Sequence, residues 1–296
     1  MKRSLRTLAI GLAVAGTTAT GIGLTAASAS GTTSTSKVVA VRAGHHTGFD
    51  RFVLEFSGPV PSRSITWVSH VTQDGSGHTV RLAGHAFLNV RLANSVAHDA
   101  SGRGTVPARQ TYALPNLTQY ALAGDFEGVV NVGLGLQRKE TVHVSTLSSP
   151  SRLVIDVSTP YSTTPVGAYF LDKDRYATGT TPYVVRRSRP AIAPAVARQA
   201  LERLFAGPTA AEQAGGLRFV SSRATGFTGL SVSGGVARVQ LTGGCASGGS
   251  TFTVANEIMP TLKQFASIDH VKIYGPAGYT ERPSGTSDSI PTCLEP

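Results

Sequence analysis

Between residues 37 and 157 apolar and polar positions alternate, which is the periodicity of half-buried β-strands. In the segment 48–58 one face is apolar, with Phe52, Leu54 and Phe56. The other face is mixed, with Arg51, Val53 and Glu55. Similar runs predict further strands at 38–43, 64–71, 87–93, 142–147 and 152–157. The DGSG sequence at 74–77 predicts a hairpin turn. With no amphipathic helix in this half, residues 37–157 are predicted to form an all-β sandwich or flattened barrel.

The pattern changes after the Ser/Thr/Pro-rich segment 158–165, which we interpret as a linker. Strands are predicted in the remaining chain at 166–172, 182–189, 230–241 and 269–275, the third being a hairpin that turns at Gly234-Gly235. Apolar residues at helical spacing predict helices within 193–209 and 250–266. Pro194 fits the first turn of the former, and Pro260 should kink or restart the latter. Residues 166–296 are therefore predicted to be an α+β domain.

Residues 1–29 have the organisation of a secretory signal peptide rather than of a membrane anchor. A basic region, a short apolar stretch and an A-x-A site follow one another at residues 2–6, from residue 8, and at 27–29. We expect cleavage between Ala29 and Ser30, followed by a disordered polar tail at 30–36. The mature chain is then predicted to be secreted, extracellular and cell-wall associated, without a transmembrane anchor. Removing three basic residues changes the formal net charge from +10 to +7.

The two cysteines, Cys245 and Cys293, fit an oxidising compartment. An even number of cysteines in an exported chain favours a disulfide bond between them. The alternatives are two free buried thiols, or a zinc site that would use His270.

The other candidate motifs do not indicate an active site or a cofactor. The adjacent histidines His45 and His46 point to opposite faces of a strand, so they cannot easily share a metal ion. The segment 98–102 contains His, Asp and Ser but lacks the G-x-S-x-G turn of a serine nucleophile, which favours a polar loop. The glycines in NVGLG at 131–135 indicate close strand packing rather than a phosphate site.

One carboxylate pair offers an alternative. Asp125 and Glu127 lie two positions apart, so on a single strand they would share a face. Glycoside hydrolases use two carboxylates about 5–9 Å apart. A cell-wall hydrolase is therefore a competing hypothesis, although acidic residues are few, at 17 of 296, and ordinary surface carboxylates explain this pair.

The excess of basic residues points to anionic partners. Nucleic-acid binding would require basic clusters with stacking aromatics, and the run at 184–189 is the only dense one. For an exported protein, an anionic wall polymer or lipid headgroups fit the charge better than nucleic acid does. A solubilising surface without a partner is the alternative.

Two resemblances follow from motifs in the two halves. The segments at 47–61, 74–102, 125–136 and 150–157 resemble the AMIN-like domain of exported actinobacterial proteins. The segments at 168–171, 200–212 and 258–275, with the Gly-Gly hairpin, are similar to the GerMN domain named for a spore-germination protein. Pro260 and the tail 287–296, which Cys293 would attach to the domain, depart from that second pattern.

The resemblance implies a protein without an active site. AMIN domains are all-β modules associated with targeting envelope proteins to peptidoglycan, and GerMN domains are similar to modules that mediate protein association. We therefore predict a non-enzymatic envelope protein whose β domain binds cell-wall glycan or an anionic envelope polymer. The α+β domain would bind an envelope protein or another copy. The candidate contact residues are Arg51, Glu55, Trp67, His70, Asp125 and Glu127. A purely structural assembly subunit is the third hypothesis.

Overall fold

The computed structural model describes residues 35–296. The predicted signal peptide, its cleavage site at Ala29 and Ser30, and most of the polar tail lie outside the described residues. By their contacts, residues 34–296 cluster into a single unit that contains both predicted domains. No helix in the described range has both the length and the apolar character needed to cross a bilayer.

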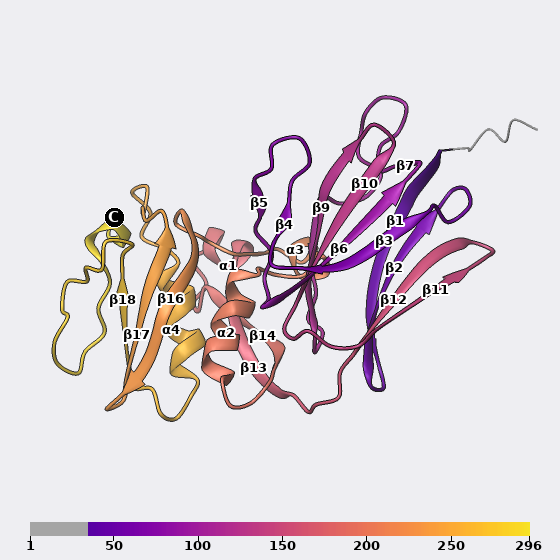
Figure 1. Cartoon of the computed structure of the whole chain (residues 1–296). Coiled ribbons are helices and arrows are strands. Elements are labelled where there is room, and N and C mark those ends of the chain that lie inside the picture. Colours follow the sequence, from indigo (N-terminus) through magenta and orange to yellow (C-terminus); the bar gives the residue numbers. More distant parts are fainter. Residues whose placement is uncertain (1–34) are drawn as a thin grey trace, which may run out of the picture. The chain divides into compact units, whose positions relative to one another are not determined.

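The first half folds into two five-stranded sheets that share one apolar core (Figure 1). The first sheet has the order β11-β12-β2-β1-β7, with bounds Val142–Leu147, Ser151–Ser158, Phe49–Phe56, Ser36–His46 and Ser95–Val96. The second has the order β3-β6-β10-β9-β8, with bounds Arg63–Val68, Ala86–Ala93, Val129–Leu136, Leu117–Phe126 and Arg109–Thr111. Phe52, Leu54 and Phe56 are buried in that core, as their alternation predicts. The predicted all-β sandwich is confirmed.

The segment 64–71 differs from its prediction because it is not one strand. It divides into β3 and the short strand β4 (Val71–Thr72), which pairs with β5 (Thr79–Val80). The turn at 74–77 joins β4 to β5, where the Gln73 carbonyl accepts the Gly77 N–H at 3.0 Å.

The second half combines two three-stranded sheets with helices, which confirms the predicted α+β class. One sheet has the order β14-β13-β15, with bounds Val184–Ala191, Thr164–Asp172 and Leu217–Arg218. The other has the order β16-β17-β18, with bounds Ala224–Ser233, Val236–Gly243 and His270–Tyr274. The helices are α1 (Lys173–Ala177), α2 (Val196–Phe205), α3 (Ala210–Ala214) and α4 (Ala255–Lys263), with a 3₁₀ turn at Thr292–Leu294. Helices α2 and α4 contact each other and β13.

The two prolines assigned to helices differ from the prediction in position: Pro194 precedes its helix, and no new helix starts at Pro260. Pro194 lies in the turn before α2, which starts at Val196, and the Gln199 amide instead bonds both backbone groups of Ile192 at 2.7 Å. Helix α4 continues through Pro260 without interruption. The missing N–H affects a single bond, and the buried side chains of Ile258 and Leu262 hold the helix in the core on either side.

The C-terminal segment is attached to the second sheet. The predicted disulfide is confirmed: Cys245 and Cys293 are bonded, with their Cα atoms 5.7 Å apart. The fully buried Lys272 ammonium donates to the carbonyls of Arg282 and Ser284 at 2.5 and 3.1 Å. Ser289 forms a parallel bridge with Lys272. These contacts place the tail along the otherwise open edge of β18.

Candidate functional site

Two of the predicted contact residues lie on the outer face of the first sheet and already have partners. Arg51 donates twice to the Asp156 carboxylate, at 2.8 and 2.7 Å, across the β2–β12 pair. Glu55 accepts from Arg42 at 2.8 Å across the β1–β2 pair. Both of these predicted contact residues are therefore engaged in ion pairs within the sheet.

The structure decides which face of the segment 65–71 points outward, and Trp67 is on the inner one. It is half-buried against the core of the β domain, and the Lys139 ammonium lies 5.8 Å from the centroid of its ring. The alternation along β3 turns Ile65 and Trp67 toward the core and Ser64 outward.

The carboxylate pair behind the hydrolase hypothesis does not form on one strand face. Asp125 lies in β9, where it accepts the Ala97 N–H at 3.0 Å and contacts the His98 ring nitrogen at 2.6 Å. Strand β9 ends at Phe126, and Glu127 occupies the β9–β10 turn with φ +50°. The turn ends the strand alternation that the same-face prediction assumes.

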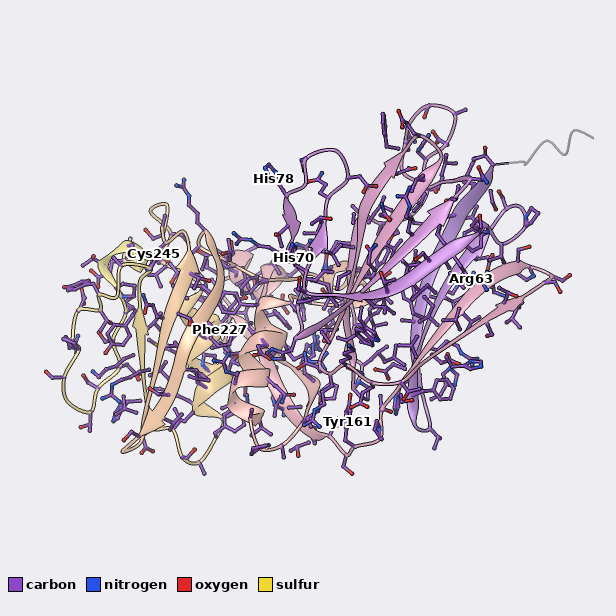
Figure 2. The ribbon with its side chains drawn as sticks, viewed as in Figure 1. Arg63, His70, His78, Tyr161, Phe227 and Cys245 are labelled. Carbon is purple, nitrogen blue, oxygen red and sulfur yellow. A yellow bond between two sulfur atoms is a disulfide. The ribbon has the colours of Figure 1, made fainter. Side chains whose placement is uncertain are left out.

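One hollow is a cleft of about 550 Å³ to which both domains contribute. The β domain supplies the 81–85 segment together with Arg109 and Gln119, whereas the α+β domain supplies the outer side of α2, the residues after it, and the start of β16. The residues that line the cleft include Arg81, His85, Arg109, Gln119, Arg198, Glu202, Phe205, Phe219, Thr225 and Phe227 (Figure 2 labels Phe227).

Glycines place the 81–85 segment at the cleft. A Cβ atom on Gly133 would lie 2.8 Å from the Leu82 side chain, and one on Gly135 would lie 2.2 Å from the Ala83 carbonyl oxygen. Gly84 has φ +133°, and a Cβ atom on it would lie 2.5 Å from the Leu136 carbonyl oxygen. Only glycine lets this segment lie directly on β10. The expectation that the NVGLG glycines permit close packing is confirmed.

The cleft is electropositive. Among the described residues that line it, three arginines (Arg81, Arg109 and Arg198) face a single carboxylate, Glu202, which leaves a formal charge of +2 with His85 neutral. Glu202 is already engaged by His85 at 3.0 Å and Arg198 at 3.6 Å. The hydrogen bond that His85 donates to the Glu202 carboxylate raises the pKa of His85 above its ordinary value.

Arg109 is the most informative of these cations. One guanidinium nitrogen donates to the Arg81 carbonyl at 2.6 Å and to the Gln119 side-chain oxygen at 2.7 Å, which orients the group. Its side chain is solvent-accessible, but the protein atoms of the cleft reduce its hydration and lower its pKa. Neither Arg81 nor Arg109 forms an ion pair with any residue in the part of the chain that the structure describes. The two arginines are therefore available to an anion.

Three phenylalanines also line the cleft. Phe205 of α2 contacts the rings of Phe219 and Phe227, with centroid separations of 5.2 and 5.6 Å. The Arg198 guanidinium lies 5.5 Å from the centre of the Phe227 ring. All three rings are only half-buried, so the cleft presents apolar ring surface beside cationic groups.

A second hollow of about 460 Å³ adjoins the cleft. It shares Arg81, Leu82 and Thr225 with the first, and His70 lies on its wall. Of the predicted contact residues only His70 borders this combined groove. The shared residues make the two hollows neighbours along one surface.

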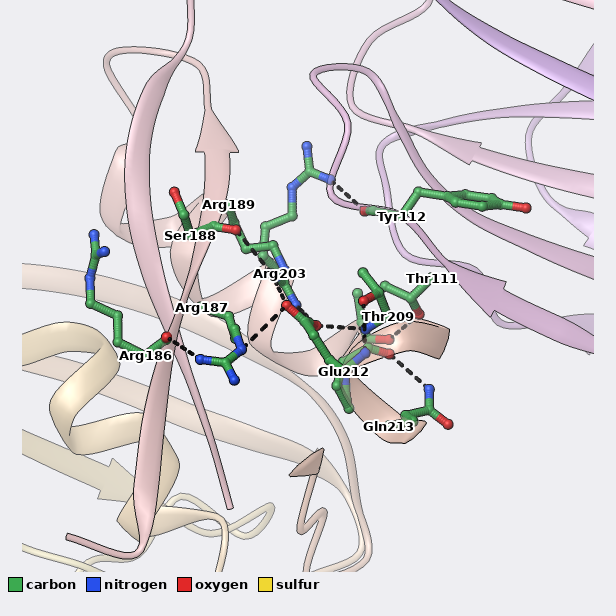
Figure 3. Close-up of polar contacts among 12 residues, drawn as sticks. Thr111, Tyr112, Arg186, Arg187, Ser188, Arg189, Arg203, Thr209, Glu212 and Gln213 are labelled. Atoms are coloured by element: carbon green, nitrogen blue, oxygen red, sulfur yellow. Dashed lines mark hydrogen bonds and ion pairs between the residues drawn. The ribbon is translucent and has the colours of Figure 1, made fainter. Parts of the chain in front are cut away.

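The end of α2 joins the two domains (Figure 3). The Ala206 carbonyl accepts the Thr111 hydroxyl at 2.6 Å and the Gln119 amide at 3.2 Å. The fully buried Arg203 donates to the carbonyls of Tyr112 and Leu114 at 3.4 and 2.8 Å. Burial lowers the pKa of Arg203 to about 10, which leaves it charged at neutral pH. These contacts, with His85–Glu202, hold the two walls of the cleft together.

The basic run at 184–189 is largely used inside its own domain. Arg189 is 1% exposed and forms two bonds to the Glu212 carboxylate, at 2.9 and 2.5 Å, while Arg187 lies 3.9 Å from the same group (Figure 3). These bonds lower the pKa of Glu212 although burial acts in the opposite direction. Arg186 remains exposed.

The arrangement provides cationic and apolar binding groups together with the paired His85 imidazole and Glu202 carboxylate. No cluster of three or more His, Cys, Asp or Glu side chains that could hold a metal ion occurs within residues 35–296.

The formal glycosylation sequon at 116–118 begins at a fully buried asparagine, Asn116, whose backbone N–H donates to Asp50 at 2.6 Å.

The comparisons with known proteins agree with the two-domain organisation. Residues 36–159 match the AMIN-like domain, and residues 168–275 match the Germane domain, described as sporulation and spore germination. No curated protein and no solved structure matched the chain significantly. The chain thus carries an AMIN-like domain followed by a Germane domain. These domain families are in general non-catalytic and indicate a cell-envelope or spore-related protein.

Proposed function

We propose that the protein is a secreted, non-enzymatic cell-envelope protein that binds an anionic wall polymer in the cleft between its two domains. The proposal keeps the predicted ligand class but moves the contact away from the outer strand face. Arg51 and Glu55 are paired there, whereas Arg81 and Arg109 have no acidic partner among the described residues.

The observation that carries the proposal is the combination of unpaired guanidinium groups with half-buried phenylalanines in one cleft. Ligand sites are typically concave, largely apolar and furnished with a few oriented polar groups, and volumes of about 300–1,000 Å³ are usual. The cleft, at about 550 Å³, has each of these properties. The imidazole–carboxylate pair of the cleft, His85 and Glu202, links the two domains across it, and we assign it a structural role.

Association with a protein partner is a second candidate function, and one observation favours it. Strand β14 is an edge strand of its sheet and carries the exposed Arg186. An acidic segment could pair with this edge.

The first test is co-sedimentation of the mature chain with purified cell walls. We expect the wild type to pellet at low salt and to be released as salt screens the charges. The affinity of the double variant Arg81→Ala/Arg109→Ala should be lower by a factor of at least about ten, since hydrogen bonds to charged groups contribute about 1.5–3 kcal/mol. No reducing ends should appear in the supernatant.

A matched control separates the site from net charge. Arg63→Ala/Arg91→Ala removes the same charge from two exposed arginines on β3 and β6 that have no ion pair in the described chain (Figure 2 labels Arg63). This control should pellet like the wild type. Equal loss in both double variants would reduce the interaction to nonspecific charge and reject the cleft.

A further inference from the structure

We propose that the unit recognised in the cleft is a sugar ring that bears a carboxylate, as in a hexuronate polymer, rather than a phosphodiester chain or a peptide. This inference rests on the proposed function and specifies its ligand. Three features of the cleft support it.

The first feature is the set of phenylalanines that line the cleft. Phe205 and Phe227 are half-buried, and their rings contact each other at 5.6 Å, so they form a continuous apolar surface. The Arg198 guanidinium lies over the Phe227 ring, and phenyl groups carry no hydrogen-bonding atom, so the ring surface that remains suits apolar groups of a ligand. A pyranose ring offers such a surface in its C–H groups, whereas a polyol phosphate chain has no ring to place there.

The second feature is the pair Arg81 and Arg109, neither of which has a carboxylate partner within residues 35–296. A guanidinium group presents parallel N–H donors that match a carboxylate, and such bidentate pairs are stronger than neutral hydrogen bonds. Arg109 is held by the Arg81 carbonyl and Gln119 through one nitrogen, so its remaining N–H groups can address a ligand. In a uronate the carboxylate is attached directly to the ring, which fits a cleft in which cations and phenyl rings line the same space.

The third feature concerns the strand that borders the cleft. An extended peptide commonly binds by adding a strand to an open sheet edge. Strand β16 is an edge strand, but its pairing with β17 shifts register between Ala224 and Gly226 and again between Thr228 and Ser231. Such irregularities disrupt the regular ladder that strand addition extends. The cleft therefore favours a ligand that contacts the side chains of the protein and not the backbone edge of β16.

The combined groove also suits a polymer. The second hollow continues from the first through Arg81, Leu82 and Thr225, and is lined by Thr79, Thr242 and His70. Hydroxyl and imidazole groups can exchange hydrogen bonds with sugar hydroxyls. Neighbouring sugar units would occupy this extension.

Isothermal titration of the mature chain with soluble probes tests the inference. The probes are trigalacturonate, the neutral trisaccharide maltotriose, a short poly(glycerol phosphate), and triglutamate. We expect trigalacturonate to bind at least tenfold more tightly than each of the others. Comparable binding of poly(glycerol phosphate) or triglutamate would overturn the inference, as would absence of trigalacturonate binding.

Conservative variants then test each contact. Arg109→Lys keeps the charge but loses the planar fork, and Phe227→Leu keeps an apolar side chain but loses the ring. Each should weaken trigalacturonate binding at least fivefold, while Arg63→Ala should not change it. Unchanged binding in both cleft variants would place the sugar elsewhere. As a measurement that needs no variant, trigalacturonate should displace wild-type protein from cell walls, and maltotriose should not.

The two proposals can fail separately. Walls that bind the protein through Arg81 and Arg109, without any trigalacturonate binding or displacement, would reject the carboxylated sugar and retain the cleft as a polymer site. If the protein binds neither cell walls nor trigalacturonate, both proposals are rejected.

Discussion

At the scale of single residues, Glu257 shows how burial and hydrogen bonding compete. Its side chain on α4 is fully buried, and its two oxygens accept the N–H groups of Leu171 and Val220, each at 2.9 Å. Burial raises its pKa to about 8, although the two backbone bonds act in the opposite direction. This residue joins α4 to β13 and to the segment that leads into β16, so it lies behind one wall of the cleft.

The protonation of Glu257 predicts a pH dependence of stability. Between about pH 5 and pH 8 the folded protein binds more protons at this residue than the unfolded chain does, so the free energy of unfolding should fall as pH rises. The decrease should be on the order of a few kcal/mol. Urea unfolding at several pH values measures it, and Glu257→Gln, which cannot ionise, should have a flatter profile. Parallel profiles for the two proteins would contradict the raised pKa.

At the scale of elements, the two edges of the second sheet of the α+β domain are treated differently. The C-terminal segment covers the edge of β18 through the Ser289 bridge, and the disulfide and Lys272 hold it there. The opposite edge, β16, borders the cleft and has irregular pairing. Unprotected strand edges favour aggregation, so the covered edge protects the domain.

Removal of the disulfide should therefore have two effects. The bond closes a loop with a sequence separation of 48, for which the chain-entropy model gives about 4 kcal/mol of stabilisation. Cys245→Ser/Cys293→Ser should unfold at a correspondingly lower urea concentration, and should aggregate more readily as the edge of β18 is released. Light scattering during mild heating measures the second effect. A variant as stable and as soluble as the wild type would contradict this role of the tail.

The strand predictions show what periodicity can and cannot reveal about elements. Half-buried strands such as β2 were predicted because their burial alternates. Strands β9 and β10 were not identified as a hairpin, because β10 is buried at seven consecutive positions and has no polar face to mark it. The wrong prediction that Asp125 and Glu127 share a strand face has the same cause, because nothing in the pattern marks 127–128 as the turn of a hairpin.

At the scale of the whole molecule, the cleft depends on how firmly α2 holds the two domains together. Arg203 is a buried cation that donates hydrogen bonds to the backbone carbonyls of Tyr112, Leu114 and Pro115. Removing one partner of a buried charged interaction is strongly destabilising, and here the unpaired carbonyls would also remain. The domains therefore should unfold together while this contact is intact.

Replacement of Arg203 tests that coupling. In Arg203→Met we expect the single unfolding transition of the wild type to separate into two, and wall binding to weaken although no cleft arginine has changed. Calorimetry measures the first effect and co-sedimentation the second. Arg218→Met, which removes an exposed arginine of β15 that bonds only within its own domain, is the control. A single transition with unchanged wall binding in Arg203→Met would show that the domains do not depend on this contact.

The candidate site was beyond sequence reasoning for a related physical reason. Arg81, Arg109, Arg198 and Phe227 come from four distant segments in two domains, and their common location depends on the Ala206 and Arg203 contacts. The sequence does supply two indirect signals: the NVGLG glycines, which require a close neighbour, and the basic excess, which requires an anionic partner or a solvated surface. Neither signal indicates that the two domains form one site.

Hydrogen exchange of the mature chain with and without saturating soluble wall fragments is the most direct test of the central claim, that the two domains form one polymer-binding cleft. The account predicts slower exchange in the cleft segments at 81–85, 198–207 and 224–227, from both domains at the same ligand concentration. Slower exchange confined to the outer faces of β2 and β12, around Arg51 and Glu55, with the cleft segments unchanged, would contradict it.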